Sequence, residues 1–424
     1  MRRRRGISVG TILMLLLSCV TISLTFAVIL DIRKDEGDLA MDAERLLASV
    51  GELMTMSQQH SQPAQSTVKV DVVSTSAPEA PAPVVQPTVN DATAPLATQA
   101  QQPMVTPAIR RTISMTFGGT IALESSVIAG AFDKEKDAYD YSEILSGIAP
   151  AVHADVNFAV LDTMFAPAAA QTQDHIAPID ALYILKDAGF DTAILCGQDA
   201  LAGGMEAVQQ TISSLDAHGM HALGVHMPGT AKDYSIMQLN GLQVAVFTYT
   251  ETLSSASKKA IADEMQRLSM VHVFDADKAC ADIKLAKQQG AQFAVVFLHW
   301  GTEDAEIPVA AQRKTAQALC DAGADVIIGY NSKYVMPVER LQSGIDPAHQ
   351  AVVAWSLGTL ISEDRSTRGV VSGVLLHVRL GFDHVGQKAA IENVEYTPTY
   401  CWRQEENGLY PYREIGRASC RERV

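Results

Sequence analysis

The chain has 424 residues, 47% of them hydrophobic, which is enough to bury a large core and to hold more than one domain. Its 33 Lys and Arg residues are outnumbered by 48 Asp and Glu residues, giving a formal net charge of −15. This balance argues against a nucleic-acid partner, because neutralising phosphates requires a basic face. The six cysteines lie far apart without CxxC spacing, so neither a disulfide framework nor a zinc motif is predicted.

The N-terminus predicts a membrane anchor. Residues 1–6, MRRRRG, form a basic stub, and the run from Ile7 to Leu30 carries no charge. A helix of about 20 apolar residues crosses a bilayer, and this run exceeds the ~7–15 residues of a signal-peptide core. By the positive-inside rule the stub is cytoplasmic, so the main domain is expected outside the cell membrane. A cleaved signal peptide is the alternative, and it would also export the chain.

Two segments separate this predicted transmembrane helix (7–30) from the folded part. Residues 31–59 carry apolar side chains near helical spacing, which predicts a short juxtamembrane helix. Residues 60–109 are rich in Pro, Ala, Gln and Thr and have no apolar period. Such a composition cannot bury enough surface to offset its ordering entropy, so this segment is expected to be a disordered linker.

Residues 110–402 predict an α/β domain. Four times a helical pattern runs into a glycine turn and then a β-rich run, and these glycines are Gly189, Gly219, Gly290 and Gly323. Glycine suits the left-handed position that ends many helices. Further strands are expected over residues 112–119, 242–250, 351–361 and 370–380. The expected fold class is therefore α/β, a layered mixed sheet with helices on both faces and antiparallel additions near the C-terminus.

The last eleven residues, 414–424, read EIGRASCRERV and are basic and unperiodic. They are more typical of a translated cloning scar than of native protein, so we expect them outside the fold. A genuine surface tail is the alternative.

The stretch VVFLHWGTEDAEIP, Val295 to Pro308, marks a candidate site. A β-branched apolar run ends there in His299 and Trp300, and Glu303 follows. Open α/β sheets bind their ligands beyond the carboxyl ends of their strands, where such polar residues lie. Three roles are open to His299, namely a hydrogen-bonding cap of the sheet edge, a lining residue of a binding pocket, and a catalytic base.

The segments around this stretch resemble a known family. FLHWGTEDAEIP is followed by a helical run and by AGADVIIGYNSKYVMPVE, and the same region contains SMTFGGTIALE, FTYTETL, WSLGTLISED and STRGVVSGVLLHVRL. In these segments the chain is similar to the CapA family of capsule synthesis proteins, the poly-γ-glutamate capsule family. The resemblance covers the whole folded region and implies a metallophosphatase-like fold. It also implies involvement in assembling or tethering a capsule or cell-envelope polymer.

The resemblance weakens at the positions that hold metals in that family. Ligand-type residues of the family pattern are replaced here: an acid by Gly119, asparagines by Val160, Gly197, Gln198 and Thr359, an aspartate by Ala202, and histidines by Tyr330 and Lys333. The ligand-type side chains that remain are His299, Asp199, Asn331 and Asp162. A two-metal centre needs roughly five to seven ligands, so these four imply at most one weakly bound divalent metal and no other cofactor. The Lys333 ammonium would stand in for a metal's charge or repel a metal.

Three interpretations compete on this basis, the third of which is an inert structural relic. The first is a binding or scaffolding module with a degenerate metal site, a pseudoenzyme that contacts an envelope polymer or its synthase complex. Its binding residues would be Trp300, Glu303, Lys333 and Glu339. The second is an active metal-dependent hydrolase, phosphoesterase or transpeptidase-like enzyme, with His299 as its catalytic residue beside Asp199 and Lys333.

Overall fold

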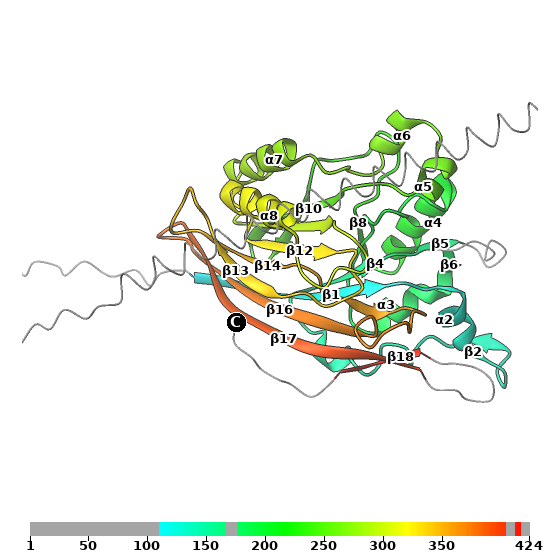
Figure 1. Cartoon of the computed structure of the whole chain (residues 1–424). Helices are drawn as coiled ribbons and strands as arrows, with labels where there is room; N and C mark the ends of the chain where they lie inside the picture. Colours follow the sequence, from blue (N-terminus) through cyan, green and yellow to red (C-terminus); the bar gives the residue numbers. More distant parts are fainter. Residues whose placement is uncertain (1–109, 167–175, 404–411, 417–424) are drawn as a thin grey trace, which may run out of the picture. The chain divides into compact units, whose positions relative to one another are not determined.

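The computed structural model describes residues 110–166, 176–403 and 412–416, which belong to one structural unit, Ala100–Val424 (Figure 1). The predicted stub, transmembrane helix, juxtamembrane helix and linker lie outside these residues. Within the described ranges, no helix combines the length and apolarity needed to cross a membrane.

The first of two large sheets has eight strands, ordered β18-β17-β16-β1-β4-β7-β8, with β15 pairing β1 off this path. Its strands are β1 (Arg110–Ile121), β4 (Val156–Leu161), β7 (Thr192–Ile194), β8 (His221–Leu223), β15 (Thr359–Ile361), β16 (Ser372–Asp383), β17 (Lys388–Arg403) and β18 (Tyr412–Gly416). The strands from β1 to β8 are parallel, whereas β16, β17 and β18 are joined by antiparallel pairs. The predicted antiparallel additions near the C-terminus are confirmed.

The second sheet has six strands, ordered β13-β14-β12-β11-β10-β9. They are β9 (Ser235–Leu239), β10 (Leu242–Thr250), β11 (Phe293–His299), β12 (Val326–Tyr330), β13 (Val338–Gln342) and β14 (Gln350–Ala354). The four central strands are parallel and the two edge strands antiparallel. Because the central strands are covered on both faces, they are apolar almost throughout, as parallel strands usually are.

Helices and short elements complete the described part. The helices are α2 (Ser125–Gly130), α3 (Tyr183–Asp187), α4 (Gly204–Ala217), α5 (Ser255–Ala260), α6 (Glu264–Leu268), α7 (Ala276–Gln288) and α8 (Ala310–Ala322), with 3-10 turns η1 (Ala149–Ala151) and η3 (Ile179–Leu182). Two small ladders pair β2 (Phe132–Asp133) with β3 (Ala138–Tyr139) and β5 (Met164–Ala166) with β6 (Ile176–Pro178).

The two large sheets pack face to face. Phe117 and Phe158 of the first sheet stack with ring centroids 5.2 Å apart, and Phe297 of the second lies 5.2 Å from Phe158. A buried cluster from both sheets surrounds these rings. The outer face of the first sheet is covered by α2, α3 and α4, and that of the second by α7 and α8, which lie side by side (Figure 1). The mixed α/β layered fold is confirmed, but the single sheet we expected is a pair of sheets.

The predicted helix ends agree with the structure. All four glycines have positive φ, and Gly323 at φ 107° is the C-cap of α8. A side chain at that angle would clash with the backbone, so glycine is favoured there.

Two predicted boundaries differ from the structure. The strand expected over residues 351–361 is broken at Gly358, whose φ is 67°, and its halves β14 and β15 join different sheets. In addition, β18 pairs with β17 and contains residues 414–416 of the expected tail, so the first sheet extends past the predicted boundary at residue 402.

Candidate functional site

A pocket of about 290 Å³ lies where parallel strands of both sheets end. Six of the eight residues predicted as catalytic, binding or metal-ligating residues line it, namely Asp162, Asp199, His299, Glu303, Asn331 and Lys333. Asp162 follows β4, His299 ends β11, and Asn331 and Lys333 follow β12. Because the carboxyl ends of parallel strands meet at one edge, residues far apart in sequence share this pocket.

His299 is held at the inner wall of the pocket. Its strand pairs in register with β10 and β12, opposite Thr250 and Tyr330. The imidazole is 6% exposed and meets the Tyr330 ring edge-on at 5.2 Å. Burial lowers the pKa of His299 to about 4 because it disfavours the charged form, although the charge of Asp199 acts in the opposite direction. The side chain is therefore a neutral imidazole near pH 7.

Gly197 makes room for the Asp162 carboxylate beside this imidazole. A Cβ atom at Gly197 would lie 2.7 Å from Asp162 Oδ1 and 3.9 Å from His299 Cδ2. The first distance is too short for a real contact, so the larger residue of the family pattern would displace Asp162.

Asp199 and Asn331 are engaged in the local structure. Ser254, the N-cap of α5, donates a short hydrogen bond to Asp199 Oδ1. Asn331 has φ 114° and its Nδ2 donates to the Gly301 carbonyl at 2.7 Å. Both side chains therefore hold loops around the pocket, which reduces their freedom to serve as ligands.

Lys333 occupies the pocket rim as the centre of an ion cluster. Its Nζ lies 3.0 Å from Asp364 Oδ2 and 3.3 Å from Glu303 Oε2. Burial lowers the pKa of Lys333, but the hydrogen bond to Asp364 and the two carboxylate charges outweigh it and raise that pKa above its ordinary value. Glu303 also accepts from Gln198 Nε2 at 3.3 Å. The lysine is therefore charged and paired with acids.

Tyr330, at another histidine position of the family pattern, faces the inner core. Its hydroxyl shares a short hydrogen bond with the Cys196 thiol. Burial raises the pKa of Cys196 to about 12 and raises that of Tyr330 as well. Both groups are neutral, so neither can act as an anionic ligand.

The described residues at this edge do not fit a dinuclear metal centre. At Gly119, where the family pattern has an acid, a Cβ atom would lie 2.5 Å from the Gly358 carbonyl oxygen and 2.9 Å from that of Leu357. The backbone of the β14–β15 connection thus excludes any side chain there. Over the described ranges, no three His, Cys, Asp or Glu side chains are grouped so that they could hold a metal. A two-metal site needs roughly five to seven ligands grouped around its ions, and the described acids and His299 that line this pocket are not grouped in that way.

Two residues expected in the site lie elsewhere, which corrects the prediction. Trp300 is buried under the helices on the outer face, where it stacks on Trp355 at 5.6 Å and donates from Nε1 to the Trp355 carbonyl at 3.1 Å. Successive strand residues point to opposite faces, so the neighbour of His299 points away from the pocket. Glu339 lies on β13 and pairs with Arg313 of α8 at 3.0 Å.

Glu124 is a pocket residue that the sequence reasoning missed. It follows β1, and its carboxylate accepts hydrogen bonds from Ser362 Oγ at 2.9 Å and from the Glu363 backbone N–H at 3.0 Å. Burial raises its pKa above the ordinary value. A polar residue at or just after the end of an apolar strand is the pattern that indicates His299. Glu124 shows the same pattern after the first apolar strand, so the sequence also indicates Glu124.

Comparison with known proteins places this arrangement in a family. The model for the bacterial capsule synthesis protein PGA_cap matches residues 114–364. The PGA biosynthesis protein CapA of Bacillus subtilis (strain 168) is 26% identical over 191 residues, which cover 45% of this chain and 47% of that protein. The capsule biosynthesis protein CapA of Bacillus anthracis is 28% identical over 186 residues, 43% of each chain. The match therefore spans less than half the length of these relatives.

Solved structures are more distant. A 5'-nucleotidase precursor from Thermus thermophilus aligns with a TM-score of 0.40 at 10% identity, over 68% of this chain and 54% of that one. The NAD nucleotidase of Haemophilus influenzae aligns with a TM-score of 0.38 at 12% identity, over 72% and 54%. Scores of this size support no inference about activity. The family match alone covers more than half of the chain, and it shows that this protein belongs to the bacterial capsule synthesis PGA_cap family, as the CapA resemblance predicted.

Proposed function

We propose that this protein helps to assemble or tether a capsule or cell-envelope polymer, and that it does so as a binding module with a degenerate metal site. Family membership supports the capsule context. The observation that carries the binding role is Lys333, whose ammonium sits between Glu303 and Asp364 at a histidine position of the family pattern. The ammonium already occupies the place between these two carboxylates, so a divalent metal bound by them would have to displace it.

The charge of the pocket restricts how a polymer would bind. Glu124, Asp162, Asp199 and Glu303 line it together with a single lysine, which is already paired. Carboxylates of a polyanion would be repelled, whereas amide and hydroxyl groups can hydrogen-bond to the acids and to Gln198. We therefore expect the pocket to contact the neutral backbone groups of the polymer.

The location completes the proposal. The uncharged run 7–30 and the arginines before it support a single-pass anchor with a cytoplasmic N-terminus and the α/β domain outside. The linker 60–109 would let the domain reach the polymer or its synthase complex.

One observation favours the enzyme as a second candidate. His299, Asp162 and Asp199 reach the same pocket, and the imidazole is unprotonated near pH 7, as a general base must be. In this alternative His299 would act on a substrate bound at the rim near Lys333.

Polymer binding by the full chain separates the two functions. We expect calorimetry with poly-γ-glutamate oligomers to give saturable binding. Lys333→Ala should weaken this binding about tenfold, because Glu303 and Asp364 lose the cation that pairs with them. The control Lys314→Ala removes an exposed lysine of α8 and should bind as the wild type does. Stoichiometric Mn or Zn together with phosphodiester or γ-glutamyl hydrolysis that His299→Ala abolishes would establish the enzyme instead. Absence of polymer binding in the wild type would contradict the binding role.

A further inference from the structure

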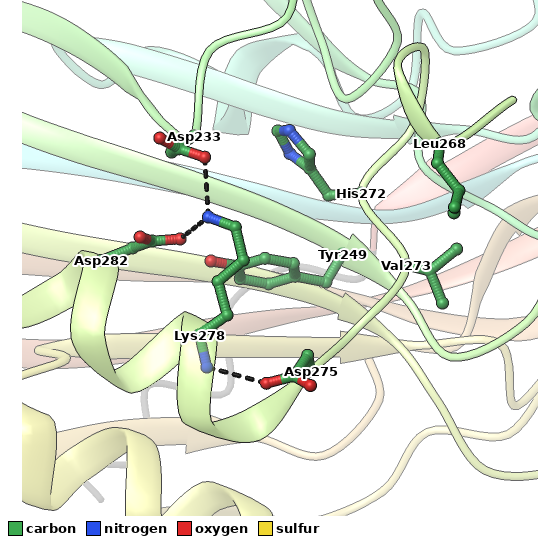
Figure 2. A pocket seen from close by; sticks show the side chains of 8 residues that line it. All are labelled: Asp233, Tyr249, Leu268, His272, Val273, Asp275, Lys278 and Asp282. Carbon is green, nitrogen blue, oxygen red and sulfur yellow. Dashed lines mark hydrogen bonds and ion pairs between the residues drawn. The ribbon is translucent and has the colours of Figure 1, made fainter. Parts of the chain in front are cut away.

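A second pocket, of about 180 Å³, lies on the helix-covered side of the six-stranded sheet (Figure 2). Its polar lining consists of Asp233, Tyr249, His272, Asp275, Lys278 and Asp282. They come from the end of β10, the first half of α7, the segment before α7 and the segment before β9. None of them lines the pocket around His299, so this is a separate feature.

The charges of this pocket favour a cation. Lys278 Nζ bridges Asp233 Oδ1 at 2.7 Å and Asp282 Oδ2 at 2.6 Å, while Asp275 caps α7 by accepting from the Lys278 backbone N–H. Burial, assisted by the Lys278 charge, lowers the pKa of His272, so the imidazole is neutral near pH 7. Three carboxylates against one ammonium leave an excess of two negative charges.

An unsatisfied hydroxyl in the same pocket points independently to a ligand. Tyr249 is 3% exposed, and its hydroxyl has no hydrogen-bond partner within the described part of the chain. The ring is fixed by Phe274 at 5.6 Å and by His272 at 6.3 Å. Figure 2 shows the phenol oxygen on the side of the ring that faces Lys278 and Asp282. A buried hydroxyl without a partner costs free energy, which a ligand hydrogen bond would recover.

The geometry selects an organic cation over a metal ion. The Lys278 ammonium already lies between the Asp233 and Asp282 carboxylates. Among the described residues, no three His, Cys, Asp or Glu side chains are arranged to bind a metal ion. The other oxygens, Asp233 Oδ2 and Asp282 Oδ1, accept no hydrogen bond within those residues. Leu268 and Val273, 45% and 38% exposed, add an apolar wall. The volume corresponds to about six water-sized groups, enough for a short aliphatic chain.

We propose that this pocket binds a primary ammonium group on a short aliphatic stem, as found in a free diamine or a lysine side chain. The ammonium donates its three N–H bonds to Asp233, Asp282 and the Tyr249 oxygen, and the stem packs on Leu268 and Val273.

Titration of the full chain with cadaverine tests this assignment, with N-acetyl-lysine amide as the second source of the group and 1-pentanol as the uncharged comparison. We expect saturable binding of one or both amines by calorimetry and none of the alcohol. Tyr249→Phe keeps the ring and should weaken amine binding about tenfold, because one hydrogen bond to a charged group is lost. Asp233→Asn should give a loss of about the same size.

Matched controls change exposed residues away from the pocket. Tyr139→Phe and Asp216→Asn should bind the amines as the wild type does. Tighter binding of either amine identifies the source and supports the assignment. It is overturned if neither amine binds, if 1-pentanol binds as well as cadaverine, or if Tyr249→Phe and Asp233→Asn bind like the wild type. Binding of Ca²⁺ that the same variants weaken, without amine binding, also overturns it.

Discussion

Protonation of His299 should destabilise the folded protein in weak acid. The unfolded chain binds a proton there below its ordinary pKa of 6.5, whereas the folded protein binds it only near pH 4. Between these values the unfolded state carries more protons, so the free energy of unfolding falls as the pH falls through this window. Removing the imidazole should therefore make stability less dependent on pH.

The structure sets the size of this effect. Each pKa unit corresponds to about 1.4 kcal/mol, and at pH 5 most of the unfolded chain is protonated at this position while the folded chain is not. The contribution of His299 between pH 7 and pH 5 is then about 2 kcal/mol. Burial also lowers the pKa of His226, His272 and His377, so the wild type should lose stability in acid at several sites.

Urea unfolding of the full chain at pH 7 and pH 5 measures how much His299 contributes to the pH dependence of the free energy of unfolding. In His299→Gln the difference in unfolding free energy between the two pH values should be about 2 kcal/mol smaller than in the wild type. Any packing loss around Tyr330 is common to both pH values and cancels. His221→Gln removes an exposed histidine and should leave the difference unchanged. An unchanged difference in His299→Gln would refute desolvation as the origin of the shift.

Three further predictions concern the packing around the two sheets. In urea titrations Gly119→Asp should lower the free energy of unfolding by at least about 3 kcal/mol, because its Cβ would lie 2.5 Å from a backbone oxygen. The control Gly344→Ala, whose Cβ would have no contact under 3.7 Å, should change that free energy by less than about 0.5 kcal/mol. Asp325→Asn should lower the free energy of unfolding by about 3 kcal/mol in the same assay, because Lys287 Nζ lies 2.6 Å from this buried carboxylate. A decrease of less than about 1 kcal/mol would contradict the importance of that ion pair. Cys196 should stay unmodified by iodoacetamide at about pH 8 until urea unfolds the chain, because the thiol is buried and its pKa is raised to about 12; mass spectrometry showing labelling of the native protein would refute its burial.

Local patterns in the sequence predicted much of the fold. The glycines at 189, 219, 290 and 323 have the positive φ expected of helix ends, and a strand begins within a few residues of each. These features depend on residues adjacent in the chain, so periodicity and turn chemistry reveal them. The prediction of one strand over 351–361 is wrong: Ser356 and Thr359 interrupt the apolar residues only singly, but Gly358 turns the chain from one sheet into the other.

The candidate site was partly predictable for a similar reason. His299, Asp162 and Lys333 follow apolar strands, and parallel strands bring such residues to one edge. Trp300 was wrongly included because side-chain alternation sends it to the opposite face, where Trp355 covers it. Glu339 was wrongly included because its partner Arg313 lies on a helix whose packing no local pattern reveals.

The family and most of the order of helices and strands could be predicted from local patterns in the sequence. Three features became visible in the folded protein alone: two sheets pack face to face, the backbone at Gly358 leaves no room beside Gly119, and Lys333 pairs with Asp364. Folding also places Tyr249, Asp233 and Lys278 in the lining of one pocket. The physical reason is that these contacts join residues distant along the chain, and such contacts form through packing and charge pairing rather than through local propensity.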